Sequence, residues 1–167
     1  MAELVADNGM MALTYQWRGC KPGSVDDVQI QKFVDDARGA INFIKAQGAR
    51  KIILAGASLG GCASAKLALE AGASGLIVLA SPPTISQWGF EIESADLNTD
   101  IPKLFITAEN DDTVPVDATR ALYDLALDPK EWQTYSGSAH GTDLFGTDSK
   151  AELQDRILQF IRSINGG

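Results

Sequence analysis

The 167-residue sequence is poor in the residues that bind metals and build disulfide frameworks. It contains a single histidine, His140, and two cysteines, Cys20 and Cys62. Two cysteines are too few for a disulfide-stabilised secreted scaffold, so a reduced, cytoplasmic protein is the simplest expectation. One histidine with two scattered cysteines also argues against a zinc site. We therefore expect neither a metal nor another cofactor.

Basic residues are in the minority, and long apolar runs are lacking. The chain has 14 Lys and Arg against 22 Asp and Glu, which gives a formal net charge of -8 at pH 7. Such a surface repels phosphate backbones and anionic lipids, so nucleic acid and membranes are not expected partners. No apolar run approaches the length of a membrane span, and no basic and apolar N-terminal segment indicates a leader.

What the sequence does contain is an alternation of short apolar runs and amphipathic helical patterns. The predicted strands are 11–17, 51–57, 75–81, 103–109 and a weaker one at 131–136. The predicted helices are 25–47, 62–71, 115–127 and 151–164, and the first residues look like the end of another helix. Strands that are apolar on both faces are covered by helices on both sides. The alternation predicts one α/β domain over residues 1–167, a three-layer α/β/α sandwich around a mostly parallel sheet of about five strands.

A serine stands directly after the second predicted strand, where such sheets place their functional sites. Ser58 lies in the stretch GASLG, between Gly56 and Gly60 and just before a predicted helix. Since the chain has 16 glycines, the spacing alone is weak evidence, and a plain strand-to-helix turn would look the same. The position between strand and helix favours an exposed nucleophile, with the amide of Leu59 as the first donor to an oxyanion.

Two further strand ends carry the partners that a serine nucleophile needs. His140 lies in the small polar loop SGSAHGTD, which suits a general base. The turn AENDDTVP supplies Glu109, Asp111 and Asp112 as candidate carboxylates to orient the imidazole. A solvated acidic turn is the alternative for most of these carboxylates.

These motifs resemble those of α/β-hydrolases of the esterase or dienelactone-hydrolase-like kind. GASLGG is similar to the nucleophile turn of that superfamily, ENDDTVP to its acid turn, AHG to its histidine loop, and YQWRGCKPGS to the segment after its fourth strand. The resemblance covers nearly the whole chain and implies a truncated α/β-hydrolase fold, its C-terminal two thirds. Alignment on Val114 and Pro115 implies Asp111 as the acid, with Asp112 as runner-up.

The sequence departs from this family in its first part. The strands that usually precede 11–17, and the loop whose amide is the second oxyanion donor, are not found in it. We expect the sheet to close, with 11–17 pairing directly with 51–57. The alternative is that a second copy of the chain, or another polypeptide, covers the shortened sheet edge. A backbone amide from 18–24 is our hypothesis for the second donor.

The resemblance implies hydrolysis of an ester, thioester, lactone or amide. Residues 82–100 are too few for a cap domain, and a short flap at about 84–99 is expected instead. Trp88 and Cys20 are candidate substrate contacts, and simple packing is an equal alternative for Trp88. A small cap favours short-chain or otherwise accessible carboxylic esters, cleaved by Ser58, His140 and Asp111 through an acyl-enzyme. The alternatives are another acyl bond, or a weak or inactive remnant of the fold that acts as a binding or assembly module.

Overall fold

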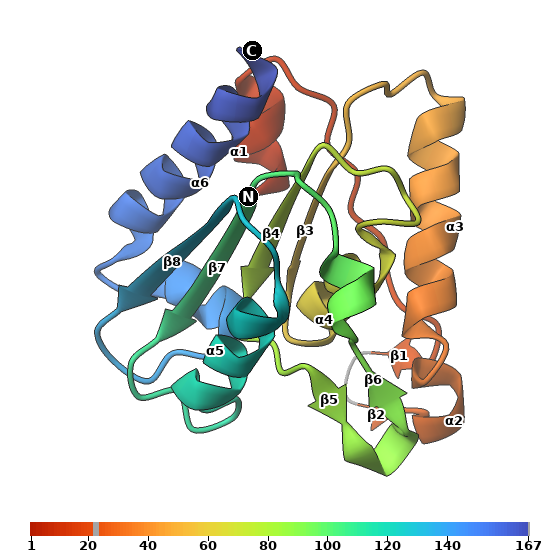
Figure 1. Cartoon of the computed structure of the whole chain (residues 1–167), viewed down its shortest axis with the longest axis vertical. Coiled ribbons are helices and arrows are strands. Elements are labelled where there is room, and N and C mark those ends of the chain that lie inside the picture. The colour runs from red at the N-terminus through yellow and green to blue at the C-terminus, as the bar shows by residue number, and fades with distance from the viewer. Residues whose placement is uncertain (22–23, 167) are drawn as a thin grey trace. The chain divides into compact units, whose positions relative to one another are not determined.

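A computed structural model of the chain describes residues 1–21 and 24–166 (Figure 1). The chain divides into two compact units, Met1–Arg50 and Lys51–Gly167, and each is described by itself. The single domain expected over 1–167 therefore stays a prediction. No helix in the described ranges is long and apolar enough to cross a membrane.

The first unit is mainly helical. Its elements are α1 (Ala2–Asp7), β1 (Cys20–Lys21), β2 (Ser24–Val25), α2 (Asp27–Ile30) and α3 (Phe33–Ala46). The strands β1 and β2 form a small antiparallel pair. Two helices thus replace the single helix predicted over 25–47. The side chain of Asp26 caps α2 by accepting hydrogen bonds from the N–H groups of Val28 and Gln29.

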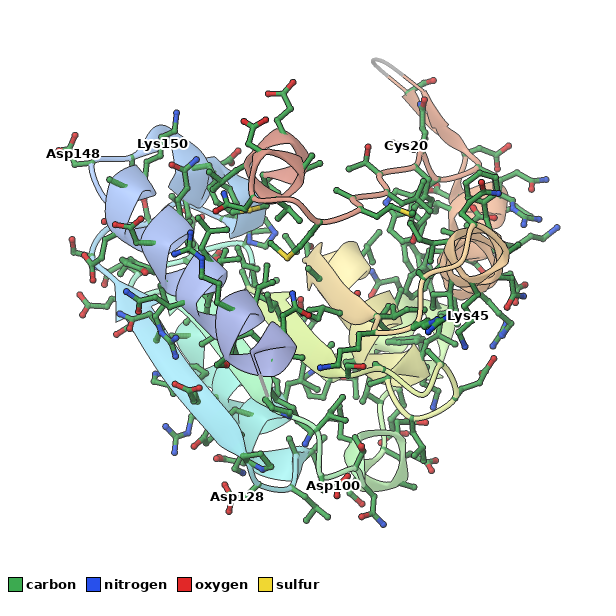
Figure 2. The ribbon with its side chains drawn as sticks, turned by 90° about the horizontal axis from the view of Figure 1, so that it is seen from above. Cys20, Lys45, Asp100, Asp128, Asp148 and Lys150 are labelled. Atoms are coloured by element: carbon green, nitrogen blue, oxygen red, sulfur yellow. The ribbon has the colours of Figure 1, made fainter. Side chains whose placement is uncertain are left out.

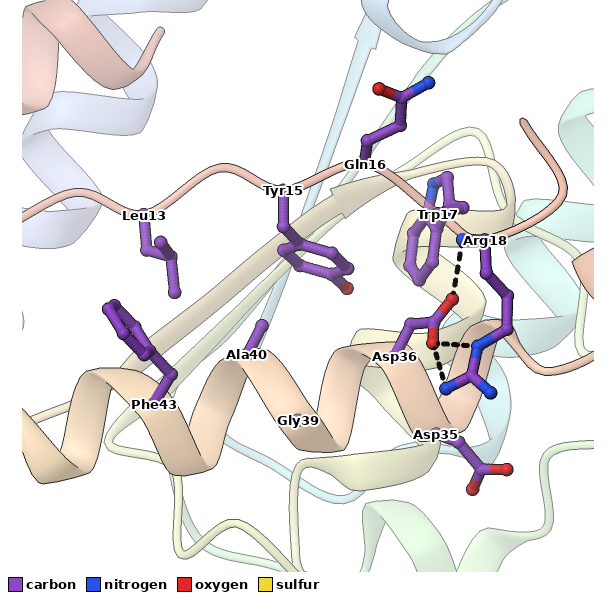
Figure 3. A pocket seen from close by; sticks show the side chains of 10 residues that line it. All are labelled: Leu13, Tyr15, Gln16, Trp17, Arg18, Asp35, Asp36, Gly39, Ala40 and Phe43. Atoms are coloured by element: carbon purple, nitrogen blue, oxygen red, sulfur yellow. Dashed lines mark hydrogen bonds and ion pairs between the residues drawn. The ribbon is translucent and has the colours of Figure 1, made fainter. Parts of the chain in front are cut away.

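The segment 11–17 is not a strand in the described structure, and the predicted pairing with 51–57 is wrong. The side chains of Leu13, Tyr15 and Trp17 point towards α3 instead, as Figure 3 shows. The rings of Tyr15 and Trp17 are 4.9 Å apart, and Trp17 lies 6.2 Å from the ring of Phe33. Arg18 then pairs with Asp36 of the same helix. A strand needs a neighbouring strand for its backbone hydrogen bonds, and alternating apolar side chains do not supply one.

An open groove of about 600 Å³ lies between this segment and α3 (Figure 3). Apolar side chains line much of it, among them Leu13, Tyr15 and Phe43. Burial here, together with the carboxylate of Asp36, raises the pKa of Tyr15 to about 12.

The second unit contains the parallel sheet. Its main elements are β3 (Ile53–Ala57), α4 (Leu59–Leu67), β4 (Gly75–Leu79), β7 (Lys103–Ala108), α5 (Val116–Leu125), β8 (Lys130–Tyr135), η3 (Gly141–Gly146) and α6 (Lys150–Asn165). The label η stands for a 3₁₀ helix. The sheet has four strands in the order β3-β4-β7-β8, all parallel, instead of about five. Every residue of β4 and β7 is buried, which confirms that helices cover both faces.

Close contacts show which helix covers which face. A Cβ added to Gly75 would lie 2.3 Å from Ile164 of α6, whereas one added to Gly61 of α4 would lie 3.0 Å from Val78. Because residues 75 and 78 of one strand point to opposite faces, α4 and α6 lie on opposite sides of the sheet.

The third helix of this unit lies on the same face as α4. Phe105 of β7 pairs in register with Val78, so their side chains share that face. The ring of Phe105 lies 5.5 Å from that of Tyr123 in α5. The three-layer α/β/α arrangement is confirmed, with α4 and α5 on one face and α6 on the other.

A small hairpin and two 3₁₀ helices follow β4, in the segment at about 84–99 where a flap is predicted. This segment contains β5 (Thr84–Ile85), η1 (Ser86–Trp88), β6 (Phe90–Glu91) and η2 (Ser94–Leu97). The strands β5 and β6 pair as an antiparallel hairpin. The turn between them uses Gly89 at φ 61°, a backbone conformation that glycine adopts without strain.

A fully buried lysine, Lys103, connects the loops at the amino end of the sheet by hydrogen bonds. The ammonium group of Lys103 donates to the backbone carbonyls of Thr99, Ile101 and Leu127, at 2.6, 2.9 and 3.0 Å. Burial lowers the pKa of Lys103, while the carboxylates of Asp100 and Asp128, labelled at this end in Figure 2, act in the opposite direction.

Candidate active site

Ser58 occupies the tight turn between β3 and α4, with an unusual backbone conformation. Its φ is 52° and its ψ is -122°, a region that residues with a side chain rarely adopt. Such a conformation costs about 1–3 kcal/mol and persists only where the surroundings impose it, most often at functional sites. Although Ser58 is the N-cap residue of α4, its side chain makes no capping hydrogen bond. The hydroxyl is therefore not used to build the helix.

Two glycines allow the strand and the helix to approach this closely. A Cβ at Gly56 would lie 2.2 Å from the backbone carbonyl carbon of Gly60. A Cβ at Gly61 would lie 2.0 Å from the Oγ atom of Ser81. No side-chain carbon fits at such distances, so the sharp turn depends on glycine at both positions.

Hydrogen bonds hold the main chain of Ser58 at both ends. Its N–H donates to the carbonyl of Leu79 at 2.9 Å. Its carbonyl accepts from the N–H of Cys62 at 3.0 Å and from the Ser81 hydroxyl at 2.9 Å. As the first residue of α4, Leu59 has an N–H without an acceptor inside the helix, as an oxyanion donor requires.

The structure brings Asp111 to His140. One carboxylate oxygen of Asp111 lies 2.9 Å from Nδ1 of His140. The other accepts from the N–H groups of Thr113 and Val114, at 3.0 and 2.9 Å. The carboxylate is fully buried, whereas the side chain of His140 is 21% exposed. An ionised carboxylate only accepts, so this contact suits the tautomer in which Nδ1 carries the proton and Nε2 can accept one.

The other two candidate acids, Glu109 and Asp112, are exposed. The structure places Asp111, the acid that the resemblance implies, against His140, and leaves the runner-up Asp112 facing solvent. The N–H of Asn110 donates to the carbonyl of Gly137 at 3.0 Å, which ties the acid turn to the loop that carries His140.

The histidine loop lies beside the serine turn. A Cβ added to Gly141, the residue after His140, would lie 3.2 Å from the Cβ of Ala57, the residue before Ser58. Ser58, Asp111 and His140 therefore all lie at the carboxyl edge of one sheet, each after a different strand. A hydroxyl, an imidazole and a buried carboxylate in this order can support acyl transfer.

The other predicted site residues are the substrate contacts Trp88 and Cys20 and the second oxyanion donor. Trp88 lies half-buried in η1, and Cys20 lies half-buried in β1 of the first unit. Their assignment as substrate contacts stays a prediction. So does the second oxyanion donor from 18–24, of which Pro22 and Gly23 lie outside the described residues. Within 1–21 and 24–166, no three His, Cys, Asp or Glu side chains gather as ligands for a metal ion.

Several solved structures have a fold similar to that of this chain. An alpha-beta serine hydrolase homologue from Coxiella burnetii matches with a TM-score of 0.71 and 23% identity, over 95% of this chain and 72% of that one. One of two metagenome-derived lipolytic enzymes matches with a TM-score of 0.80 and 15% identity, over 97% and 86% of the chains. The chain has the α/β-hydrolase fold. An esterase from Pyrococcus furiosus shares this α/β-hydrolase fold at a TM-score of 0.74 and 13% identity, over 96% and 74% of the chains. No sequence-family profile and no curated protein sequence matches the chain.

Sequence reasoning missed one residue of this candidate site. Ser81 follows β4 and is fully buried beneath the turn of Ser58. A signal was available: Ser81 is the first polar residue after an entirely apolar strand, at the edge of the sheet that also carries Ser58. The sequence does not show that β3 and β4 are neighbours, so local spacing does not connect the two serines.

Proposed function

We propose that this chain is a serine hydrolase that cleaves short-chain carboxylic esters. The contact between Asp111 and His140, next to the strained turn that presents Ser58, is the observation that carries the proposal. A solvated acidic turn has no need to bury a carboxylate against the only histidine of the chain.

The proposed reaction follows from the roles of these three groups. His140 takes the proton of the Ser58 hydroxyl through Nε2, and the serine oxygen attacks the ester carbonyl. The N–H of Leu59 and the amino end of α4 stabilise the resulting oxyanion. The imidazolium, held by Asp111, returns the proton to the departing alcohol and leaves an acyl-enzyme. Water, deprotonated by His140, then attacks the acyl group, and the acid and free Ser58 are released.

The choice of an ester substrate rests on the similar folds and on the size of the flap. Several chains of similar fold are named as esterases or lipolytic enzymes. The flap between β4 and β7 is a short hairpin and two single helical turns, too small for a cap domain. Short acyl groups in accessible esters suit such a site, and lactones and thioesters would use the same residues.

Hydrolysis of p-nitrophenyl acetate tests the proposal. We expect steady-state turnover by the wild type and a loss of at least about 1000-fold in kcat for Ser58→Ala, because the nucleophile is removed. Ser163→Ala is the matched control, since it deletes a hydroxyl that donates to the Phe160 carbonyl in α6, outside the site. That control should retain wild-type kcat.

Labelling by a fluorophosphonate provides a second readout. We expect one adduct in the wild type, on Ser58 by peptide mass spectrometry, and none in Ser58→Ala. Equal rates in wild type and Ser58→Ala, with no adduct, would overturn the proposal and favour a binding or assembly module.

A further inference from the structure

Ser81 is a buried polar residue that the reaction above does not use. It is fully buried, and its Oγ lies 2.9 Å from the carbonyl oxygen of Ser58 and 3.0 Å from that of Leu79. The N–H of Ser58 donates to the same carbonyl of Leu79. A single hydroxyl thus lies within hydrogen-bond distance of the carbonyl of Ser58 and of the group that holds its N–H.

The geometry of the peptide bond links this contact to the oxyanion donor. The carbonyl of Ser58 and the N–H of Leu59 belong to one planar, trans peptide unit and point in opposite directions. A donor that binds the carbonyl of Ser58 therefore also sets the direction in which the N–H of Leu59 points. Donation to the carbonyl also polarises the unit, which makes its N–H a stronger hydrogen-bond donor.

The surroundings leave space for the Ser81 hydroxyl only because residue 61 is glycine. The position that a Cβ of Gly61 would occupy is 2.0 Å from the Ser81 Oγ, so the lack of a side chain there makes room for the hydroxyl. The preceding residue, Ala80, has a φ of 46°, in the region that residues with a side chain rarely adopt. Two strained residues, Ala80 and Ser58, are thus connected through Ser81. Strain of this kind is retained where it positions a functional group.

We propose that Ser81 is a positioning residue that aims the N–H of Leu59 at the oxyanion by holding the other end of the Ser58–Leu59 peptide unit. The inference rests on the proposed hydrolase function. Ser81 touches no reacting atom, and its effect passes through the peptide unit alone.

Kinetics of Ser81→Ala and Ser81→Thr with p-nitrophenyl acetate test the inference, at a temperature where both variants are folded by circular dichroism. In Ser81→Ala we expect kcat to fall about tenfold with KM unchanged, less than the 100- to 1000-fold loss on removing an oxyanion donor outright. Ser81→Thr keeps the hydroxyl but adds a methyl group to a crowded site. A hydrogen-bonding role predicts that Ser81→Thr is the more active variant, whereas a role in packing alone predicts that Ser81→Ala is.

Two further readouts separate positioning from structural damage. The inhibition constant of phenylboronic acid, whose tetrahedral adduct with Ser58 mimics the oxyanion, should rise in Ser81→Ala by the same factor as kcat falls. The pH dependence of kcat should keep its shape, because the contact of His140 with Asp111 is untouched.

The outcomes also distinguish this inference from the proposed function. A wild-type kcat in Ser81→Ala, or a Ser81→Thr variant that is slower than Ser81→Ala, would overturn the positioning role while activity lost in Ser58→Ala keeps the hydrolase. If Ser58→Ala is as active as the wild type, the proposed function itself is wrong.

Discussion

Asp111 and Asp112 are adjacent and chemically identical, yet the fold gives them different surroundings. The carboxylate of Asp111 is buried and accepts from two backbone N–H groups as well as from His140. Asp112 faces solvent. This contrast provides a matched pair for testing which carboxylate orients the imidazole.

We expect Asp111→Asn to lower kcat for p-nitrophenyl acetate by about 1000- to 10,000-fold. The amide oxygen would keep the N–H groups of Thr113 and Val114, which leaves the NH₂ group facing Nδ1 of His140. The imidazole would then carry its proton on Nε2 and could not accept one from Ser58. Asp112→Asn should stay within twofold of the wild type, and an equal loss in both variants would contradict the assignment.

The turn between β3 and α4 depends on backbones that approach more closely than side chains allow. In the sequence, Gly56 and Gly60 stand on either side of Ser58, and Gly61 follows. The structure shows why a side chain is excluded at Gly56 and at Gly61. Gly56 faces the backbone of Gly60, and Gly61 faces the Ser81 hydroxyl. These contacts join a strand, a helix and the end of the next strand into one packed junction.

Gly56→Ala should lower the free energy of unfolding by about 3 kcal/mol, because its Cβ would lie 2.2 Å from rigid backbone atoms of Gly60. The matched control is Gly146→Ala in η3, where an added Cβ meets nothing within 4 Å. That control should change stability by less than about 0.5 kcal/mol. Urea denaturation followed by circular dichroism measures both, and a tolerated Gly56→Ala would contradict the close approach of strand and helix at this junction.

For the molecule taken together, four groups that are at least partly shielded from water have pKa values that link stability to alkaline pH. Burial raises the pKa of Cys62 from 9.0 to about 12. Burial also raises the pKa of Tyr135 and, with the charge of Asp36, that of Tyr15. Burial lowers the pKa of Lys103, so this lysine works in the opposite direction. Raised values mean that the folded state holds protons that the unfolded state loses, and stability falls as pH rises.

The contribution of Cys62 can be isolated by comparing the wild type with Cys62→Ala. The neutral thiol donates to the carbonyl of Pro82 at 3.3 Å in the interior. Its stabilising contribution is fully present below pH 9 and is lost as the pH rises towards 12. The difference in unfolding free energy between the two proteins should be constant from pH 7 to 8.5. Above pH 9 it should shrink by up to about 1.4 kcal/mol per pH unit.

The other titrating groups are common to both proteins, so they cancel in this difference. Urea denaturation at each pH, with reductant present, provides the measurement. A difference that stays constant up to pH 11 would contradict the raised pKa of the thiol.

The sequence alone predicted the main strands and helices of the second unit and the strand ends that carry its reactive side chains. Local spacing shows whether a segment is a strand or a helix, and the predicted strands at 51–57, 75–81, 103–109 and 131–136 correspond to β3, β4, β7 and β8. Because parallel strands end at one edge, their order also implied that Ser58, the acid turn and His140 would gather there.

Only the tertiary structure decided which segments became neighbours. The apolar alternation of 11–17 suits a strand, but a strand forms only where another offers hydrogen bonds, and here the side chains pack on α3. The resemblance implies Asp111 over Asp112, but the burial of the Asp111 carboxylate and its contact with a distant histidine come only from the fold. Ser81 acquires its place from the pairing of β4 with β3. Each of these outcomes depends on contacts between residues far apart along the chain, which local spacing does not encode.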